Sequence, residues 1–259
     1  IIEDSVNSKV VKVVNPTSSS SSWGWSSSPY KDYVTITIPA QVKYNDTTYT
    51  VVAFEDHTFI NCAKLSSITI PNTVIDLGLR AFTGCSALTT IVLPENIKEL
   101  DYGAFYDCHS LISITIPVSV KTIGDDAFYN CSSLKKTIYK GNVSDWCKIK
   151  FLSADDSNPV NYSKNLYIND KLVVDLVIPN TVDTINNYVF YGCSSITTVT
   201  IPESVTYLAN NAFERSGLKH ITWHPKNYNN GNPGDGNSRS PFYYIKDNIQ
   251  SITFGENVD

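Results

Sequence analysis

The sequence predicts an α/β solenoid, in which short strands from successive coils stack into a parallel sheet. Three observations predict this fold. A segment of the form Leu-x-x-Ile-x-Ile-Pro recurs at a fixed interval, apolar residues follow each copy at constant spacing, and a small residue followed by Phe comes late in each unit. Self-similarity with a period of ~20–50 residues is typical of stacked repeat architectures.

The period of this repeat is 23 residues, which separates Pro71 from Pro94, Pro94 from Pro117, and Pro179 from Pro202. One unit cannot bury its apolar face alone, so stacked units are expected to share a continuous core. The phenylalanines expected to line that core are Phe59, Phe82, Phe105, Phe128, Phe190 and Phe213.

Each unit is predicted to contain one strand and one helical turn. The Ile-x-Ile alternation predicts the strand, and Pro ends it because Pro has no N–H to donate to a sheet. Ala81, Phe82 and Cys85 then have the spacing of one face of a helical turn.

The full pattern Leu-x-x-Ile-x-Ile-Pro-x-x-Val-x-x-Ile-x-x-x-Ala-Phe-x-x-Cys resembles the BspA-like class of leucine-rich repeats, over residues 34–223 with one interruption and again from Ile249. The expected fold is then a leucine-rich-repeat right-handed superhelix with short parallel strands, an N-terminal β-hairpin cap and one inserted excursion. The resemblance implies a secreted or surface-attached protein of host-associated bacteria or protozoan parasites. Members of the class look like adhesins for host proteins, and the motif contains no catalytic residues.

The repeat pattern divides the chain into six expected regions, and the incomplete last one suggests a piece of a larger protein. Hairpins are expected around Asn45–Asp46 and Asn169–Asp170, because each pair separates two strand-like segments. The regions are an N-terminal β cap with a Ser-rich Trp loop (1–52), repeats (53–134), an inserted excursion (135–175), repeats (176–223), an irregular loop (224–248) and the start of a further repeat (249–259).

Composition and motifs exclude several functions. The net charge is −5 and there is no basic block, so nucleic acid is not an expected partner. No apolar run approaches the ~18 residues that span a bilayer, so no membrane insertion is expected in this fragment. The chain lacks Gly-x-Ser-x-Gly, His-Glu-x-x-His and a phosphate-binding glycine loop, so we expect no enzyme activity and no cofactor.

Cysteine and histidine are expected to be structural or solvated. Five of the six cysteines lie three residues after the repeat Phe, a position typical of small buried hydrophobic residues, and only Cys147 lies elsewhere. We therefore expect free, buried thiols and no metal site. His220 and His224 flank Thr222, but two ligands without a carboxylate rarely hold a metal.

The outward-facing side chains of the strands form the first candidate binding surface. Most are small and hydroxylated, and they would make a ladder along a broad sheet, as solenoids commonly use for binding. The alternative is that Thr simply suits an exposed strand. The candidate ligand-binding residues on this face are Thr69, Val92, Thr115, Thr200 and Thr222.

Trp23 and Trp25 form the second candidate, because exposed indoles stack on sugars or anchor partners. The alternative is a loop that folds its indoles back onto the cap. The sequence therefore favours an extracellular or cell-surface, non-enzymatic binding module that docks a host or extracellular-matrix protein. A structural spacer that projects another domain and a glycan-binding module that uses the Trp loop remain the alternatives.

Overall fold

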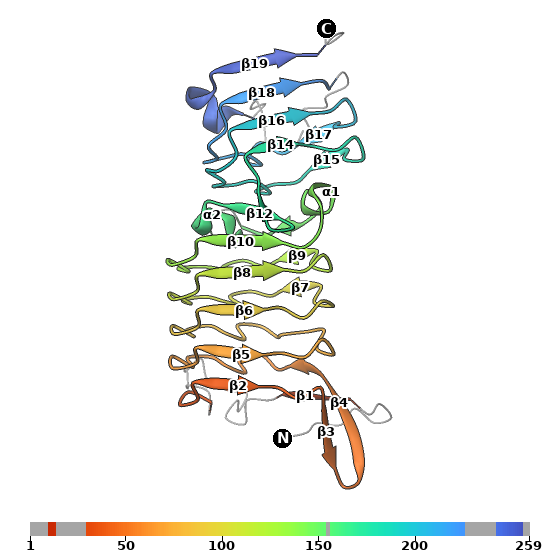
Figure 1. The fold of residues 1–259 in the computed structure, drawn as a ribbon, viewed down its shortest axis with the longest axis vertical. Coiled ribbons are helices and arrows are strands. Elements are labelled where there is room, and N and C mark those ends of the chain that lie inside the picture. The colour runs from red at the N-terminus through yellow and green to blue at the C-terminus, as the bar shows by residue number, and fades with distance from the viewer. Residues whose placement is uncertain (1–9, 14–29, 154–155, 226–241, 256–259) are drawn as a thin grey trace.

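The structure is a computed structural model that describes residues 10–13, 30–153, 156–225 and 242–255. The chain winds into stacked coils, and each coil contributes one strand to the face shown in Figure 1. In chain order, the strands of this face are β2 (Thr35–Thr37), β5 (Ser67–Thr69), β6 (Thr90–Val92), β8 (Ser113–Ile116), β10 (Lys136–Tyr139), β12 (Leu166–Ile168), β14 (Asp175–Val177), β16 (Thr198–Ile201), β18 (His220–Trp223) and β19 (Ser251–Phe254).

The strands pair in parallel, and the sequence period sets their register. Ile91 of β6 pairs with Ile114 of β8, which pairs in turn with Thr137 of β10. Among the described residues, five coils also have a shorter strand on a second face. The strands there are β7 (Glu99–Leu100), β9 (Thr122–Ile123), β11 (Lys150–Phe151), β15 (Thr184–Ile185) and β17 (Tyr207–Leu208).

The helical turn expected in each unit is not an α-helical turn. Cys85 N donates to the carbonyl of Phe82 at 3.1 Å, and Leu88 N donates to Cys85 O at 3.0 Å, so the chain makes tighter i→i+3 turns. The residue before each repeat Cys has a positive φ, for example 57° at Asn61 and 59° at Asp107, which a continuing helix does not allow. In the described ranges, the α-helices are α1 (Val143–Trp146) and α2 (Val160–Ser163).

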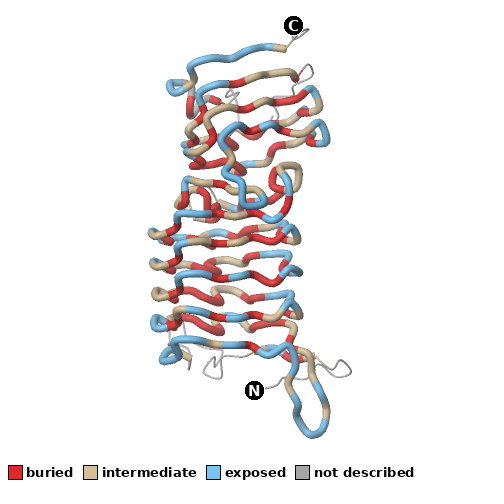
Figure 2. Tube along the Cα trace, in the orientation of Figure 1, coloured by how far each residue is buried: buried red, intermediate tan, exposed pale blue. Residues whose placement is uncertain are grey.

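The core is continuous, as the repeat predicts. The rings of successive phenylalanines stack, with centroids 5.4 Å apart for Phe59 and Phe82 and 5.5 Å apart for Phe82 and Phe105. Buried residues recur along the coils, whereas exposed residues occur at the corners and along the front strands, and β19 is exposed throughout (Figure 2).

The expectation of free, buried thiols is confirmed for the five cysteines at the repeat position, and Cys147 is also free and buried. The Sγ of Cys108 donates to the carbonyl oxygen of Phe82 in the preceding coil at 3.2 Å, and Cys131 makes the same contact with Phe105. Burial raises the pKa of Cys131 and of Cys147 to about 12. Thiols this basic are unreactive at neutral pH, because the thiolate is the nucleophile.

The N-terminal region contains the hairpin expected around Asn45–Asp46. Strands β3 (Gln41–Tyr44) and β4 (Thr47–Phe54) pair antiparallel, and both turn residues have positive φ. Strand β1 (Val10–Val13) runs parallel to β4. Strand β2 pairs with β5, so the ladder of coils already begins inside residues 1–52. Trp23 and Trp25 lie outside the described residues.

The residues of the expected excursion, 135–175, stay within the stack of coils and form a longer coil. Strand β10 pairs with β8 in the regular register, and β11 pairs with β9 on the second face. Strand β12 follows β10 in the sheet, with Thr137 paired to Leu166, 29 residues later. We call residues 140–165 the enlarged coil. The chain thus adds residues without leaving the solenoid.

The expected broad sheet is divided on the front face, because the β2–β5 pair is separate from the sheet that starts at β6 and the ladder is interrupted again after the enlarged coil. The second predicted hairpin is present: β13 (Lys171–Leu172) folds back on β12 around Asn169 and Asp170, both with positive φ. Since β13 occupies the edge of β12, the next strand cannot pair there. A separate sheet of β14, β16, β18 and β19 starts at β14. Strand β19 follows a 3-10 helix, η1 (Tyr243–Asn248), and pairs with β18, where the sequence predicts a further repeat.

Candidate binding surface

The structure places the predicted ladder residues on one face but in different sheets. Val92 pairs with Thr115 in the sheet that contains β6 and β8, and Thr200 pairs with Thr222 in the sheet that starts at β14. Thr69 belongs to the β2–β5 pair. Thr69 and Val92 are exposed, whereas Thr115, Thr200 and Thr222 are half-buried.

Larger side chains continue the row from Val92 and Thr115. In register, Thr115 is followed by Ile138 of β10, Tyr167 of β12 and Leu172 of β13. We call Val92, Thr115, Ile138, Tyr167 and Leu172 the central patch. The exposed fractions are 73% for Val92 and 43% for Leu172, and Ile138 and Tyr167 are half-buried. The row of hydroxyl-bearing side chains on this face is therefore continued by apolar and aromatic side chains on β10, β12 and β13.

Sequence reasoning missed Ile138, Tyr167 and Leu172. A signal existed for Ile138, because Leu134 to Tyr139 aligns with Leu111 to Ile116 at the regular spacing of 23 residues. No such signal marks Tyr167 or Leu172, because the longer coil moves them out of the repeat register.

The charge around the central patch is positive. Lys136 is the single charged residue among the outward-facing strand positions of β2, β5, β6, β8, β10 and β12, and its Nζ lies 5.6 Å from the centroid of the Tyr167 ring. Beyond the break, Asp175 is exposed and its Oδ1 accepts a hydrogen bond from Thr198 Oγ1 at 2.7 Å. A partner that covers the patch must therefore desolvate few charges.

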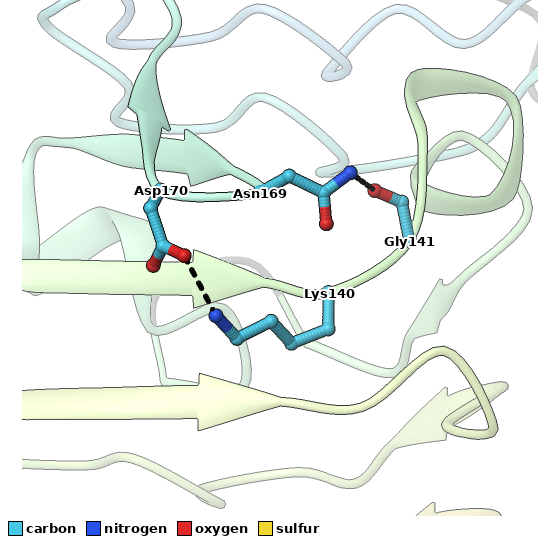
Figure 3. A network of polar contacts seen from close by, with 4 residues as sticks. All are labelled: Lys140, Gly141, Asn169 and Asp170. Atoms are coloured by element: carbon cyan, nitrogen blue, oxygen red, sulfur yellow. Dashed lines mark hydrogen bonds and ion pairs between the residues drawn. The ribbon is translucent and has the colours of Figure 1, made fainter.

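Polar contacts fix the hairpin that carries Tyr167 and Leu172 (Figure 3). Lys140 Nζ lies 2.9 Å from Asp170 Oδ2, and Asn169 Nδ2 donates to the carbonyl of Gly141 at 3.0 Å. Both contacts tie the β12–β13 turn to the end of β10. An exposed ion pair of this kind adds ~0–1 kcal/mol, so its main effect is to orient the hairpin.

A buried layer supports the patch from below. The indole of Trp146 is fully buried, and its Nε1 donates to Val189 O at 2.9 Å. Under β10, Thr137 Oγ1 and Ser163 Oγ share a hydrogen bond of 2.8 Å. These contacts hold the enlarged coil against the coils on both sides, so the central patch lies on a rigid support.

The described residues contain no cluster of three His, Cys, Asp or Glu side chains that could hold a metal ion. His220 is exposed and its Nδ1 lies 2.9 Å from Ser251 Oγ. Within the same ranges, no helix has the length and apolar character needed to cross a membrane.

Comparison with known proteins identifies one family. Six copies of the family model described as BspA type leucine rich repeat region match residues 52–172 and 160–259. No curated protein matches. Among solved structures, the chain is similar to a Treponema pallidum leucine-rich repeat protein, with 26% identity over 73% of this chain and 72% of that one and a TM-score of 0.40.

Two further solved structures resemble the chain. A leucine-rich repeat protein from Bacteroides ovatus is 21% identical over 87% of this chain and 70% of that one, with a TM-score of 0.37. A leucine rich cell surface protein from Faecalibacterium prausnitzii is 18% identical over 87% of this chain and 89% of that one, with a TM-score of 0.34.

Proposed function

The chain belongs to the BspA-type leucine-rich repeat family, and we propose that it is a non-enzymatic protein-binding module that docks a partner on its strand face. The proposed location is the cell surface or the extracellular space, as family membership suggests. The proposed partner is a host or extracellular-matrix protein.

The central patch is the observation that carries this proposal. Protein interfaces typically have an apolar and aromatic centre with few charges, and Tyr is among the residues that contribute most to binding energy. Tyr167 lies between Ile138 and Leu172, and the hydroxyl-bearing strands on either side supply a polar rim. Because Lys136 is the single charged residue among the outward-facing positions of β6, β8, β10 and β12, salt should affect affinity only modestly.

The experiment is binding of the purified chain to a panel of immobilised matrix proteins and glycans. A saturable protein ligand is expected, and Tyr167→Ser should weaken its binding about tenfold or more. The matched control is Tyr44→Ser, because Tyr44 is also exposed but lies on the β3–β4 hairpin, away from the patch.

Three results would contradict the proposal. Equal losses for the two variants would remove the patch as the docking site. Binding to sugars alone would favour the Trp loop, and no binding at all would favour the spacer.

A further inference from the structure

Strand β14 begins the last sheet of this face with one bare edge. It pairs with β16 alone, since β13 folds back on β12 and leaves β14 without a neighbour on the other side. This edge lies at the break in the front ladder, between β12 and β16 (Figure 1).

The hydrogen bonds of β14 show which main-chain groups face the break. Val174 O accepts from Thr197 N at 3.0 Å, and Ile178 N donates to Thr200 O at 3.1 Å. Main-chain groups of alternate residues in a strand point to opposite neighbours, so Asp175 and Val177 direct their N–H and C=O groups away from β16. Among the described residues, none of these four groups has a hydrogen-bond partner.

The side chains around this edge are apolar and accessible. Leu172 is 43% exposed, Val174 is 39% exposed and Val177 is 62% exposed. Natural edge strands are commonly protected by charged side chains, by Pro or by a covering segment, and in β14 the exposed Asp175 is the one charged residue, with no Pro in the strand. A bare edge beside exposed apolar side chains is the arrangement to which an extended peptide adds as a further strand.

We propose that the free edge of β14 takes an extended peptide segment of the partner as an added strand. Cross-strand neighbours determine its chemistry: a basic side chain beside Asp175 and an apolar side chain beside Val177, with one residue between them. The added strand lies next to Leu172, so the edge and the central patch form one continuous binding surface. The inference rests on the proposed function in that the partner is a protein.

The first test uses a fluorescein-labelled synthetic peptide with the alternating core Lys-Thr-Val-Thr-Val, titrated with the purified chain and followed by fluorescence anisotropy. Saturable binding is expected. Val177→Pro removes the N–H that faces the break and no N–H that bonds to β16, and it should weaken binding about tenfold. Val177→Thr keeps that N–H and the β-branched shape, and it should change affinity less than about threefold.

Peptides that are N-methylated at alternate residues test the edge without altering the protein. One set of methyl groups points at β14 and the other away from it, so one set should abolish binding and the other should leave it unchanged. Equal effects of both sets, or no saturable binding of the unmodified peptide, would overturn the inference. Unchanged affinity of the Val177→Pro variant for the unmodified peptide would also overturn the inference.

The two proposals fail in distinguishable ways. If a matrix protein binds, loses affinity with Tyr167→Ser and keeps it with Val177→Pro, the docking face stands and the added strand is wrong. Loss with Val177→Pro but not with Tyr167→Ser would place binding at the edge and remove the central patch.

Discussion

In the regular coils one Phe per coil stacks on the next, whereas the enlarged coil interrupts that column and contributes Trp146 to a separate cluster of aromatic side chains. Phe105 and Phe128 stack with centroids 5.3 Å apart. Phe128 N then donates to Asp156 O, as Phe105 N donates to Ala127 O, so the buried Ser157 takes the place of the next Phe. A separate cluster surrounds Trp146, whose ring centroid lies 5.2 Å from that of Tyr139 and 5.6 Å from that of Phe151.

This difference shows how a solenoid can lengthen one coil without losing its core. The added residues bring their own buried aromatic cluster, while β10, β11 and β12 keep their places in the ladders. The regular coils present small side chains on the front face, and the enlarged coil and its hairpin present Tyr167 and Leu172. The repeated packing of the regular coils therefore stabilises the stack, and the enlarged coil with its hairpin supplies the side chains of the central patch that depart from the repeat.

The largest expected loss of stability comes from the aromatic cluster of the enlarged coil. Trp146→Ala should destabilise the chain by about 5 kcal/mol, because it leaves a cavity and removes the hydrogen bond to Val189 O. Denaturant unfolding followed by circular dichroism measures the loss. A change below ~1 kcal/mol would show that Trp146 does not hold the enlarged coil against the next stack.

Phe105→Ala makes the corresponding cavity in the regular stack. Its ring is fully buried between Phe82 and Phe128, so the expected cost is about 3–5 kcal/mol. The same unfolding measurement applies. A loss below ~0.5 kcal/mol, as at a surface position, would contradict the assignment of the Phe column to the core.

The sequence predicted the regular coils well because each position there is constrained in the same way by the coil above and the coil below. The stacking of the repeat Phe rings, the burial of the repeat cysteines and the register of the strands all follow from this constraint. The turn residues show its limit: Asn61 and Asp107 have left-handed backbone conformations, so the expected helical turn does not form.

The candidate site was only partly predictable, because it depends on residues that leave the period. Val92 and Thr115 belong to the repeat and lie where the alternation places them. Tyr167 becomes their neighbour only through the 29-residue step from Thr137 to Leu166. Leu172 joins them through the β12–β13 hairpin, whose pairing ends the sheet. No local pattern indicates that the next strand will then begin a new sheet.

A smaller change in stability is expected at Ser216, which stands at the position where the other coils have the repeat Cys. Ser216 is buried, and its Oγ has no hydrogen-bond partner among the described residues. Ser216→Cys should therefore raise the free energy of unfolding by about 1 kcal/mol, because it removes a buried unsatisfied hydroxyl.

The reverse exchange in a regular coil is the matched control for that variant. Cys108→Ser should lower the free energy of unfolding by a similar amount, since Cys108 is fully buried in the column. If Ser216→Cys destabilised the chain, the shorter coil around Ser216 would not share the packing of the others.

The smallest expected effect concerns Asp101, next to β7. Partial burial, with the nearby carboxylates of Glu99, Asp76 and Asp56, raises the pKa of Asp101 above its ordinary value. The folded chain then binds this proton more tightly than the unfolded chain, so this group favours folding increasingly as pH falls through its folded-state pKa.

Asp101→Asn should therefore raise the melting temperature near neutral pH, and the gain should disappear below the ordinary Asp value of 3.8. Melting curves of both chains between about pH 7 and pH 3 measure this dependence. A gain that is independent of pH would show that it does not come from the ionisation of Asp101.

The most direct test of the central claim is an amide hydrogen-exchange footprint of the chain bound to the matrix protein found in the panel. The account predicts slower exchange on binding in β10, β12 and residues 171–177. It predicts unchanged exchange in the β3–β4 hairpin and in the turns after Phe105 and Phe128, where the rings of Tyr106 and Tyr129 stack with centroids 4.7 Å apart. Protection confined to those turns or to the hairpin, with the strand face unchanged, would contradict it.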